Sequence, residues 1–162
     1  MEEADTPNAY QGTEGLKRAI KELAADCKRQ LRIYSPDLSR QVYGDPGFTA
    51  ELRRMVTEHA RSEIRVLLHN SQAPARGGHR LVELGRKLTS YIQFRDLPVA
   101  YWHDTVEWVV CDESGVAVRD PAERGEVIYE PDAPMLARRT ARTFDRLWEL
   151  AQPSQHLRNL NI

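Results

Sequence analysis

The apolar residues of this chain recur at two different spacings. Spacings of three and four residues place side chains on one face of a helix, and they predict helices at residues 13–27, 45–60, 81–88 and 136–151. Short alternating or continuous apolar runs predict strands at residues 31–36, 63–70, 91–95, 106–111, 116–119 and 126–129.

Capping and turn residues separate these elements. Thr13 is expected to cap the first helix. Asp45-Pro46 is expected to open the second helix, because the aspartate can accept a backbone N–H and proline needs no donor there. The run Asp112-Glu113-Ser114-Gly115 predicts a tight hairpin between two strands.

The order of the elements predicts the fold class. Helices separate the early strands and turns separate the later ones, so we expect an α/β domain with a mixed, mostly parallel sheet and helices on both faces. We assign this single domain to residues 13–151, with a flexible N-terminus at 1–12 and a C-terminal tail at 152–162. A ligand is expected in the loops at the carboxyl ends of the first strands.

Length and composition narrow the class of protein. The chain has 162 residues, of which 41% are hydrophobic and 29% charged. These values are typical of one folded domain, and they exclude a disordered chain and a membrane-embedded one. Its start is acidic and polar, unlike a secretion signal, so we expect a cytoplasmic protein without a membrane span. Cys27 and Cys111 are expected to be reduced thiols near the core. They show no metal-ligand spacing, and no metal or cofactor is expected.

The net charge of −1 is unevenly distributed. An acidic segment, 99–134, lies between two basic ones, 31–98 and 135–162. Arginine accounts for most of the 23 basic residues. This preference indicates either planar recognition of phosphate or carboxylate groups or simply a GC-rich genome.

Four stretches of the chain resemble one domain of the phospholipase D superfamily of phosphodiesterases: IYSPDL, ELRRMVTEHARSEIRVLLHN, YWHDTVEWVVCDESGVAVRD and GEVIYEPDAPMLARRTARTFDRLWEL. In that superfamily the hairpin carries His-x-Lys-x4-Asp, and a closing helix carries a Phe-x-x-x-Trp pair, as Phe144 and Trp148 do here. The likeness covers about residues 14–150, and the chain is similar to a group of bacterial proteins with a degenerate domain of this type.

The resemblance also implies which residues would react. In the superfamily the histidine attacks phosphorus, the lysine neutralises phosphate oxygens, and the aspartate orients hydrogen bonds. Here His103 falls on the histidine, but Thr105 takes the lysine position and Val110 the aspartate position. Asp112 could serve only if the strand were bulged by two residues. Because a missing cation leaves the transition-state charge uncompensated, ordinary hydrolysis is not expected.

The remaining candidates each have a functional and a structural interpretation. His69, at the end of a buried strand, either lines the cleft or packs at the loop end. His79, with Arg76 and Arg80, follows a Gly-Gly pair and either holds a phosphate at a helix start or belongs to a solvated loop. Arg95 and Arg119 are the arginines that could replace the missing lysine.

The last helix carries Arg138, Arg142 and Arg146 at a spacing of four, with Arg139 beside them. This stripe is either a solvated face or a surface for a counter-charge such as a nucleic-acid backbone. The apolar end of the chain, 157–162, is expected to dock onto a neighbour or onto the protein's own surface.

These features leave three functions open. The first is a catalytically degenerate binding or regulatory module for RNA, DNA or another phosphate-bearing ligand. The second is a phosphodiesterase that uses His103 as nucleophile with a substituted cation. The third is a protein-interaction module that associates with itself as a homodimer, because superfamily members bring two motifs face to face.

Overall fold

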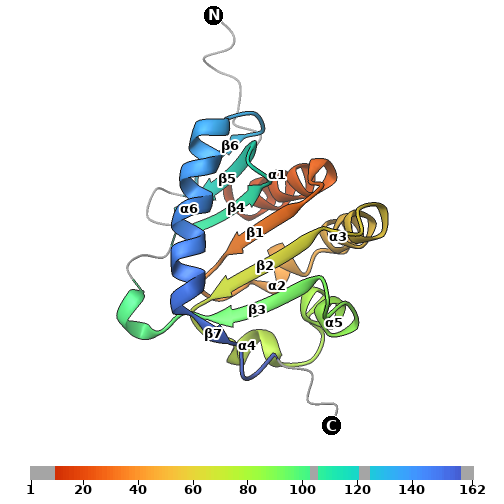
Figure 1. Cartoon of the computed structure of the whole chain (residues 1–162), viewed down its shortest axis with the longest axis vertical. Coiled ribbons are helices and arrows are strands. Elements are labelled where there is room, and N and C mark those ends of the chain that lie inside the picture. The colour runs from red at the N-terminus through yellow and green to blue at the C-terminus, as the bar shows by residue number, and fades with distance from the viewer. Residues whose placement is uncertain (1–9, 103–105, 121–124, 158–162) are drawn as a thin grey trace, which may run out of the picture.

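The computed structural model of this chain describes residues 10–102, 106–120 and 125–157 (Figure 1). Its helices are α1 (Gly12–Asp26), α2 (Arg40–Tyr43), α3 (Pro46–Glu58), α4 (Gln72–Ala75), α5 (Arg80–Lys87), the 3₁₀ turn η2 (Val99–Tyr101) and α6 (Pro134–Leu150). Its strands are β1 (Gln30–Tyr34), β2 (Glu63–Leu68), β3 (Ile92–Asp96), β4 (Glu107–Cys111), β5 (Gly115–Arg119), β6 (Val127–Glu130) and β7 (Gln152–Pro153).

These strands form one mixed sheet in the order β6-β5-β4-β1-β2-β3-β7. β1, β2 and β3 run parallel, while β4, β5 and β6 continue the sheet antiparallel from β1. The mixed α/β fold is therefore confirmed. Its parallel part is limited to the strands that helices separate, so antiparallel pairings outnumber parallel ones among the described strands, where we expected a mostly parallel sheet.

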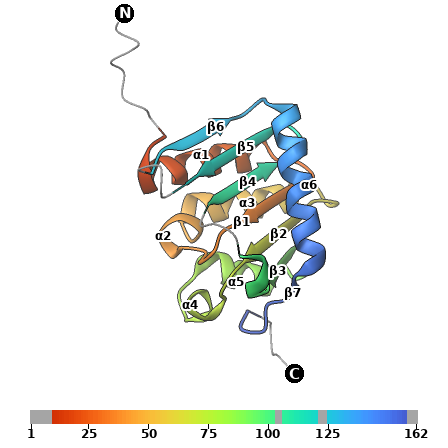
Figure 2. The same cartoon turned by 90° about the vertical axis from the view of Figure 1, so that its left-hand side faces the viewer.

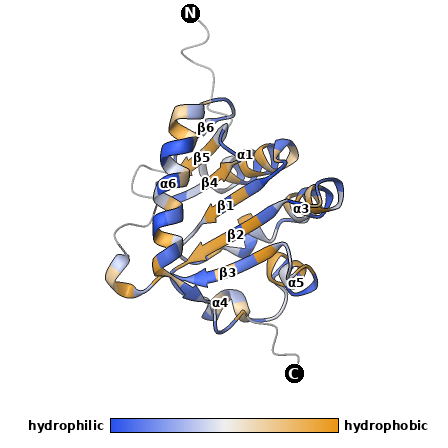
Figure 3. Cartoon of the chain, in the orientation of Figure 1, coloured by the Kyte–Doolittle hydropathy of each residue, from blue (hydrophilic) through white to orange (hydrophobic). Residues whose placement is uncertain are grey.

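Helices lie on both faces of the sheet, as predicted, but in unequal number (Figures 1 and 2). α1, α3 and α5 cover one face, where a large cluster that includes Leu16, Phe48 and Leu81 is buried. In the described part of the chain, α6 is the helix that crosses the other face, where Phe144 and Trp148 pack against β1 and β2. Hydrophilic residues interrupt the apolar ones along α6, as expected for a helix with one exposed side (Figure 3).

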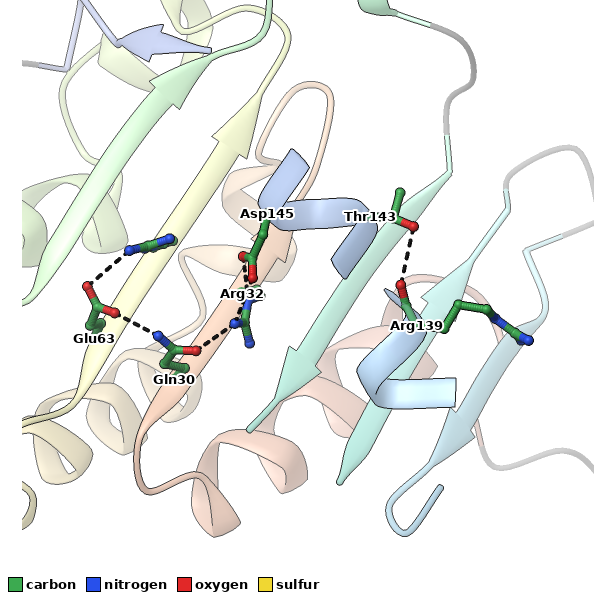
Figure 4. A network of polar contacts seen from close by, with 7 residues as sticks. Gln30, Arg32, Glu63, Arg139, Thr143 and Asp145 are labelled. Atoms are coloured by element: carbon green, nitrogen blue, oxygen red, sulfur yellow. Dashed lines mark hydrogen bonds and ion pairs between the residues drawn. The ribbon is translucent and has the colours of Figure 1, made fainter. Parts of the chain in front are cut away.

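An ion pair between a buried arginine of β1 and a half-exposed aspartate of α6 holds the helix to the sheet (Figure 4). Arg32 on β1 is 7% exposed, and its guanidinium donates to both carboxylate oxygens of Asp145 on α6, at 2.9 and 3.1 Å. Gln30 accepts from the same guanidinium at 2.6 Å and donates to Glu63 at 2.8 Å. Because the bidentate geometry fixes both planes, this network sets the position of α6 along β1.

The two helix openings turn out differently. Asp45 caps α3 as predicted, accepting from the backbone N–H of Phe48 at 3.1 Å. The predicted cap at Thr13 is wrong, because α1 begins at Gly12, its N-cap residue is Gln11, and no side chain caps it. Gly12, at a φ of 67°, turns the chain into the helix there, and its N–H donates to the carbonyl of Gly125 at 2.7 Å.

The residues after α6 belong to the packed structure. β7 pairs antiparallel with β3, and Leu157 is buried in the large cluster beyond it. The sequence left open whether this end docks onto a neighbour or onto the protein itself. Leu157 contacts the protein's own core. No helix in the described part of the chain is long and apolar enough to cross a membrane.

Candidate functional site

The carboxyl edge of the sheet, where β1 ends and β4 begins, holds a buried carboxylate. Glu107 opens β4 and is 4% exposed. Its Oε1 accepts hydrogen bonds from Ser35 at 2.8 Å and Tyr43 at 2.9 Å, and its Oε2 accepts from Arg119 at 2.6 Å. These donors come from the loop after β1, from α2 and from β5, so one side chain joins three segments.

Burial controls the protonation of this cluster. It raises the pKa of the Tyr43 hydroxyl well above the ordinary value, because a phenolate would lose its hydration and face the charge of Glu107. Tyr43 therefore remains a donor. Ser35 Oγ also accepts from the backbone N–H of Leu38 at 3.1 Å, which fixes a loop where Leu38 has a φ of 48°.

The register of β4 shows which residues can occupy the positions of the His-x-Lys-x4-Asp motif. β4 pairs with β5 in unbroken register, so the bulge that Asp112 would need in order to serve with His103 is absent along β4. Counted back from Asp112 with the spacing His-x-Lys-x4-Asp, the lysine position is Glu107 and the histidine position is Thr105. A buried carboxylate thus takes the position where this count requires a cation.

Asp112 lies at the opposite, amino edge of the sheet. Its carboxylate accepts from the backbone N–H groups of Lys28, Arg29 and Gln30, at 3.1, 2.8 and 2.8 Å. The length of β4 separates it from Glu107. Asp112 therefore organises the start of β1.

Two buried cysteines lie beside Asp112. Cys27 and Cys111 are free thiols in the core, as predicted. Their Sγ atoms and a carboxylate oxygen of Asp112 lie within 4.8 Å of one another, a donor set of the kind that zinc prefers. Interaction with Cys111 and burial raise the pKa of the Cys27 thiol far above its ordinary value, which opposes the proton loss that metal binding requires.

Aromatic side chains occupy the carboxyl edge next to β1 and β2. Tyr34 Oη lies 2.5 Å from His69 Nε2, and the His69 ring stacks on Trp102 with centroids 4.6 Å apart and planes 8° apart. His69 is half-buried and lines this edge. His103, the expected nucleophile, lies outside the described residues.

Both arginines proposed as substitute cations make contacts within the protein. Arg119 pairs with Glu107. Arg95 lies with its guanidinium 4.4 Å from the ring centroid of Trp148 and donates to the Trp148 carbonyl at 2.8 Å. Arg95 also lines a pocket together with Arg86 of α5.

The loop before α5 is tied to the loop after β1. His79 is 1% exposed, and its Nε2 lies 2.9 Å from the carbonyl of Leu38, which requires the proton on Nε2. Arg40 donates to the carbonyls of Ala73 and Gly77, among others. Arg76 and Arg80 are both exposed, on either side of the buried His79.

The arginines of α6 lie on its outer side. Arg138, Arg139, Arg142 and Arg146 are all exposed. Arg138 lies 3.3 Å from the exposed carboxylate of Glu113, whereas the described residues provide no acidic partner for the other three. Figure 4 shows the Arg139 side chain extending away from the ion pair that holds α6.

Sequence reasoning missed Glu107, Ser35, Tyr43 and Trp102 as site residues. A signal for Glu107 was present, because a lone acid within the apolar run of a buried strand needs a partner. Counting outward from the predicted hairpin turn pairs Glu107 with Arg119, as the register confirms. Ser35 and Tyr43 carried no such signal, since tertiary contacts bring them to the carboxylate.

The chain is similar to one protein family in sequence and to several solved structures in fold. Residues 12–160 match the family described as Domain of unknown function (DUF7931). No curated protein is similar enough in sequence to match. Solved structures that resemble the chain include TrmBL2, an archaeal chromatin protein whose structure shows a novel mode of DNA binding. Its TM-score is 0.63 at 15% identity, and the match covers 88% of this chain and 51% of TrmBL2.

Two phospholipase-D-like proteins match over most of both chains. Nuc from Salmonella typhimurium, a phospholipase D family member, has a TM-score of 0.55 at 14% identity, covering 83% of this chain and 87% of Nuc. NucT from Helicobacter pylori has a TM-score of 0.55 at 8% identity, covering 87% and 92%. The fold is therefore phospholipase-D-like, as the resemblance implied.

Replacing the buried carboxylate tests the Glu107 cluster. Glu107→Gln should lower the free energy of unfolding by about 3 kcal/mol, because the partly buried guanidinium of Arg119 then loses its charged partner. Adding Arg119→Met to that variant should recover part of the loss. Urea unfolding of the three proteins measures both effects, and a loss below about 1 kcal/mol for Glu107→Gln would contradict the role assigned to the ion pair.

The buried histidine predicts a pH dependence of stability. Burial lowers the pKa of His79 below its ordinary value, so below about pH 6.5 the unfolded chain binds a proton that the folded protein resists. Stability should therefore fall as the pH drops through this value and recover above it. His79→Gln should flatten the change between about pH 7 and 5 in urea unfolding. The exposed His156→Gln variant should keep the wild-type slope, and an equal flattening there would exclude His79 as the cause.

Proposed function

The chain belongs to the family described as Domain of unknown function (DUF7931), and we propose that it acts as a catalytically degenerate phospholipase-D-like module that binds nucleic acid through α6. The observation that carries the proposal is the arginine face of α6, formed by Arg139, Arg142 and Arg146. Guanidinium groups without an acidic partner attract phosphate and release counterions from a nucleic-acid backbone.

The charge at the carboxyl edge supports a binding role without hydrolysis. A phosphate placed there would face the carboxylate of Glu107. Arg119, which pairs with Glu107, already neutralises that carboxylate. Phosphoryl chemistry of this superfamily requires a fixed positive charge beside the nucleophile. The same edge therefore favours neither strong phosphate binding nor transition-state stabilisation.

The structural neighbours support the ligand class by analogy alone. TrmBL2 is a chromatin protein with a described mode of DNA binding, and this chain spans about half of its length. The phospholipase-D-like neighbours support a phosphodiester as the ancestral ligand class. By this analogy, both neighbours support a ligand with phosphate groups for this chain.

Hydrolytic activity is tested with bis(p-nitrophenyl) phosphate. We expect the wild-type protein to release nitrophenol no faster than buffer, and His103→Ala to behave in the same way. Absorbance at neutral pH over several hours measures the rate. Turnover that disappears in His103→Ala would overturn the non-hydrolytic proposal and favour the alternative phosphodiesterase with a substituted cation.

Nucleic-acid binding is tested by removing two charges from α6. Arg142→Gln/Arg146→Gln should weaken binding of a labelled oligonucleotide about tenfold at 50 mM salt, and reduce the slope of log Kd against log salt by about 2, because two phosphate contacts are lost. Fluorescence anisotropy from about 50 to 200 mM salt measures both quantities.

A control variant removes the same charge elsewhere. Arg53→Gln/Arg61→Gln changes two exposed arginines in α3 and in the loop that follows it. It should leave affinity and slope near wild type. Equal weakening by the two pairs would attribute binding to net charge, and wild-type protein that fails to bind at low salt would remove the proposal.

A further inference from the structure

Large apolar side chains are exposed where η2 leaves the carboxyl edge of the sheet. Val99 is 70% exposed, and Tyr101 and Trp102 are 37% and 38% exposed. Both views of the fold show η2, green in Figures 1 and 2, next to the C-terminal end of α6. An aromatic surface therefore adjoins the helix that carries the arginines.

The Trp102 ring is held in a fixed orientation. Its Nε1 donates to the carbonyl of Leu97 at 2.6 Å, and one ring face stacks on His69. Leu97 is 1% exposed and packs in the same cluster as Phe144 and Trp148 of α6. Because these contacts restrict the ring, a second planar group could stack on it with little loss of side-chain entropy.

Further aromatic contacts connect the Trp102–His69 stack to the sheet. His69 meets the Tyr34 ring edge-on at 5.5 Å, and Tyr34 lies 4.7 Å from Trp108. Tyr34 is 2% exposed, so this end of the stack is closed to ligands. Trp102, at the other end, is 38% exposed.

We propose that Trp102 stacks on a base of single-stranded nucleic acid whose phosphates contact the arginines of α6. This inference rests on the proposed function and adds the ligand class. Every nucleobase has a π face, and base stacking on an aromatic side chain, combined with a basic surface, is the usual recognition of single strands. A duplex keeps its bases stacked on one another, so it could use the arginines but not Trp102.

The test compares the oligonucleotide U12 with a 12-residue abasic phosphodiester and a 12-base-pair duplex, by anisotropy at 50 mM salt. Wild-type protein should bind U12 about tenfold more tightly than the abasic strand, since stacking is available only to the bases. Trp102→Ala should abolish that preference while leaving duplex binding unchanged. Tryptophan emission should be quenched by U12 in the wild type and not in Trp102→Phe, which retains Trp108 and Trp148.

Met135→Ala is the matched control, because it truncates another exposed apolar residue, 82% exposed at the start of α6. It should keep the preference for U12. Equal binding of U12 and the abasic strand by the wild-type protein would overturn the stacking inference. If that binding still weakens in Arg142→Gln/Arg146→Gln, the proposed function stands. Absence of binding to all three probes would overturn both.

Discussion

The carboxylate of Glu107, buried at the start of β4 beside the end of β1, constrains the rest of this structure. Removing an ionised group from water costs several kcal/mol unless hydrogen bonds and an opposite charge replace the lost hydration. Glu107 obtains these from Ser35, Tyr43 and Arg119. The loop after β1, the short helix α2 and the hairpin partner β5 are consequently held in one arrangement, because each must keep its donor on the same two oxygen atoms.

The same carboxylate also sets the charge at the carboxyl edge of the sheet. Glu107 takes the lysine position counted from Asp112, and among the described residues it offsets the charge of Arg119 at this edge. The positive charge that we propose for ligand binding lies elsewhere, on the outer side of α6, where Arg139, Arg142 and Arg146 are exposed. Glu107 lies in the acidic segment 99–134, and the arginines of α6 lie in the basic segment 135–162.

How much the sequence could predict depends on the range of the forces involved. Long periodic elements such as α3 and α6, and the hairpin β4–β5, follow from local patterns and were predicted with small errors at their ends. The short elements α2, α4 and β7 were not predicted, because distant contacts such as those of Arg40 with the loop after β2 fix them. Cys27 and Cys111, far apart in sequence, become neighbours only because β4 lies beside β1.

The two surfaces proposed to contact a ligand are joined through one apolar cluster. The bidentate pair between Arg32 and Asp145 fixes α6 on the sheet, and Trp148 packs beneath it. Leu97, which accepts the hydrogen bond that orients Trp102, lies in the same apolar cluster as Trp148. A strand that contacted the arginines and the ring together would therefore meet a preformed surface, and little of its binding energy would be spent on ordering the protein. Such preorganisation requires no reactive histidine, so the proposed binding of a phosphate-bearing ligand does not depend on hydrolytic chemistry.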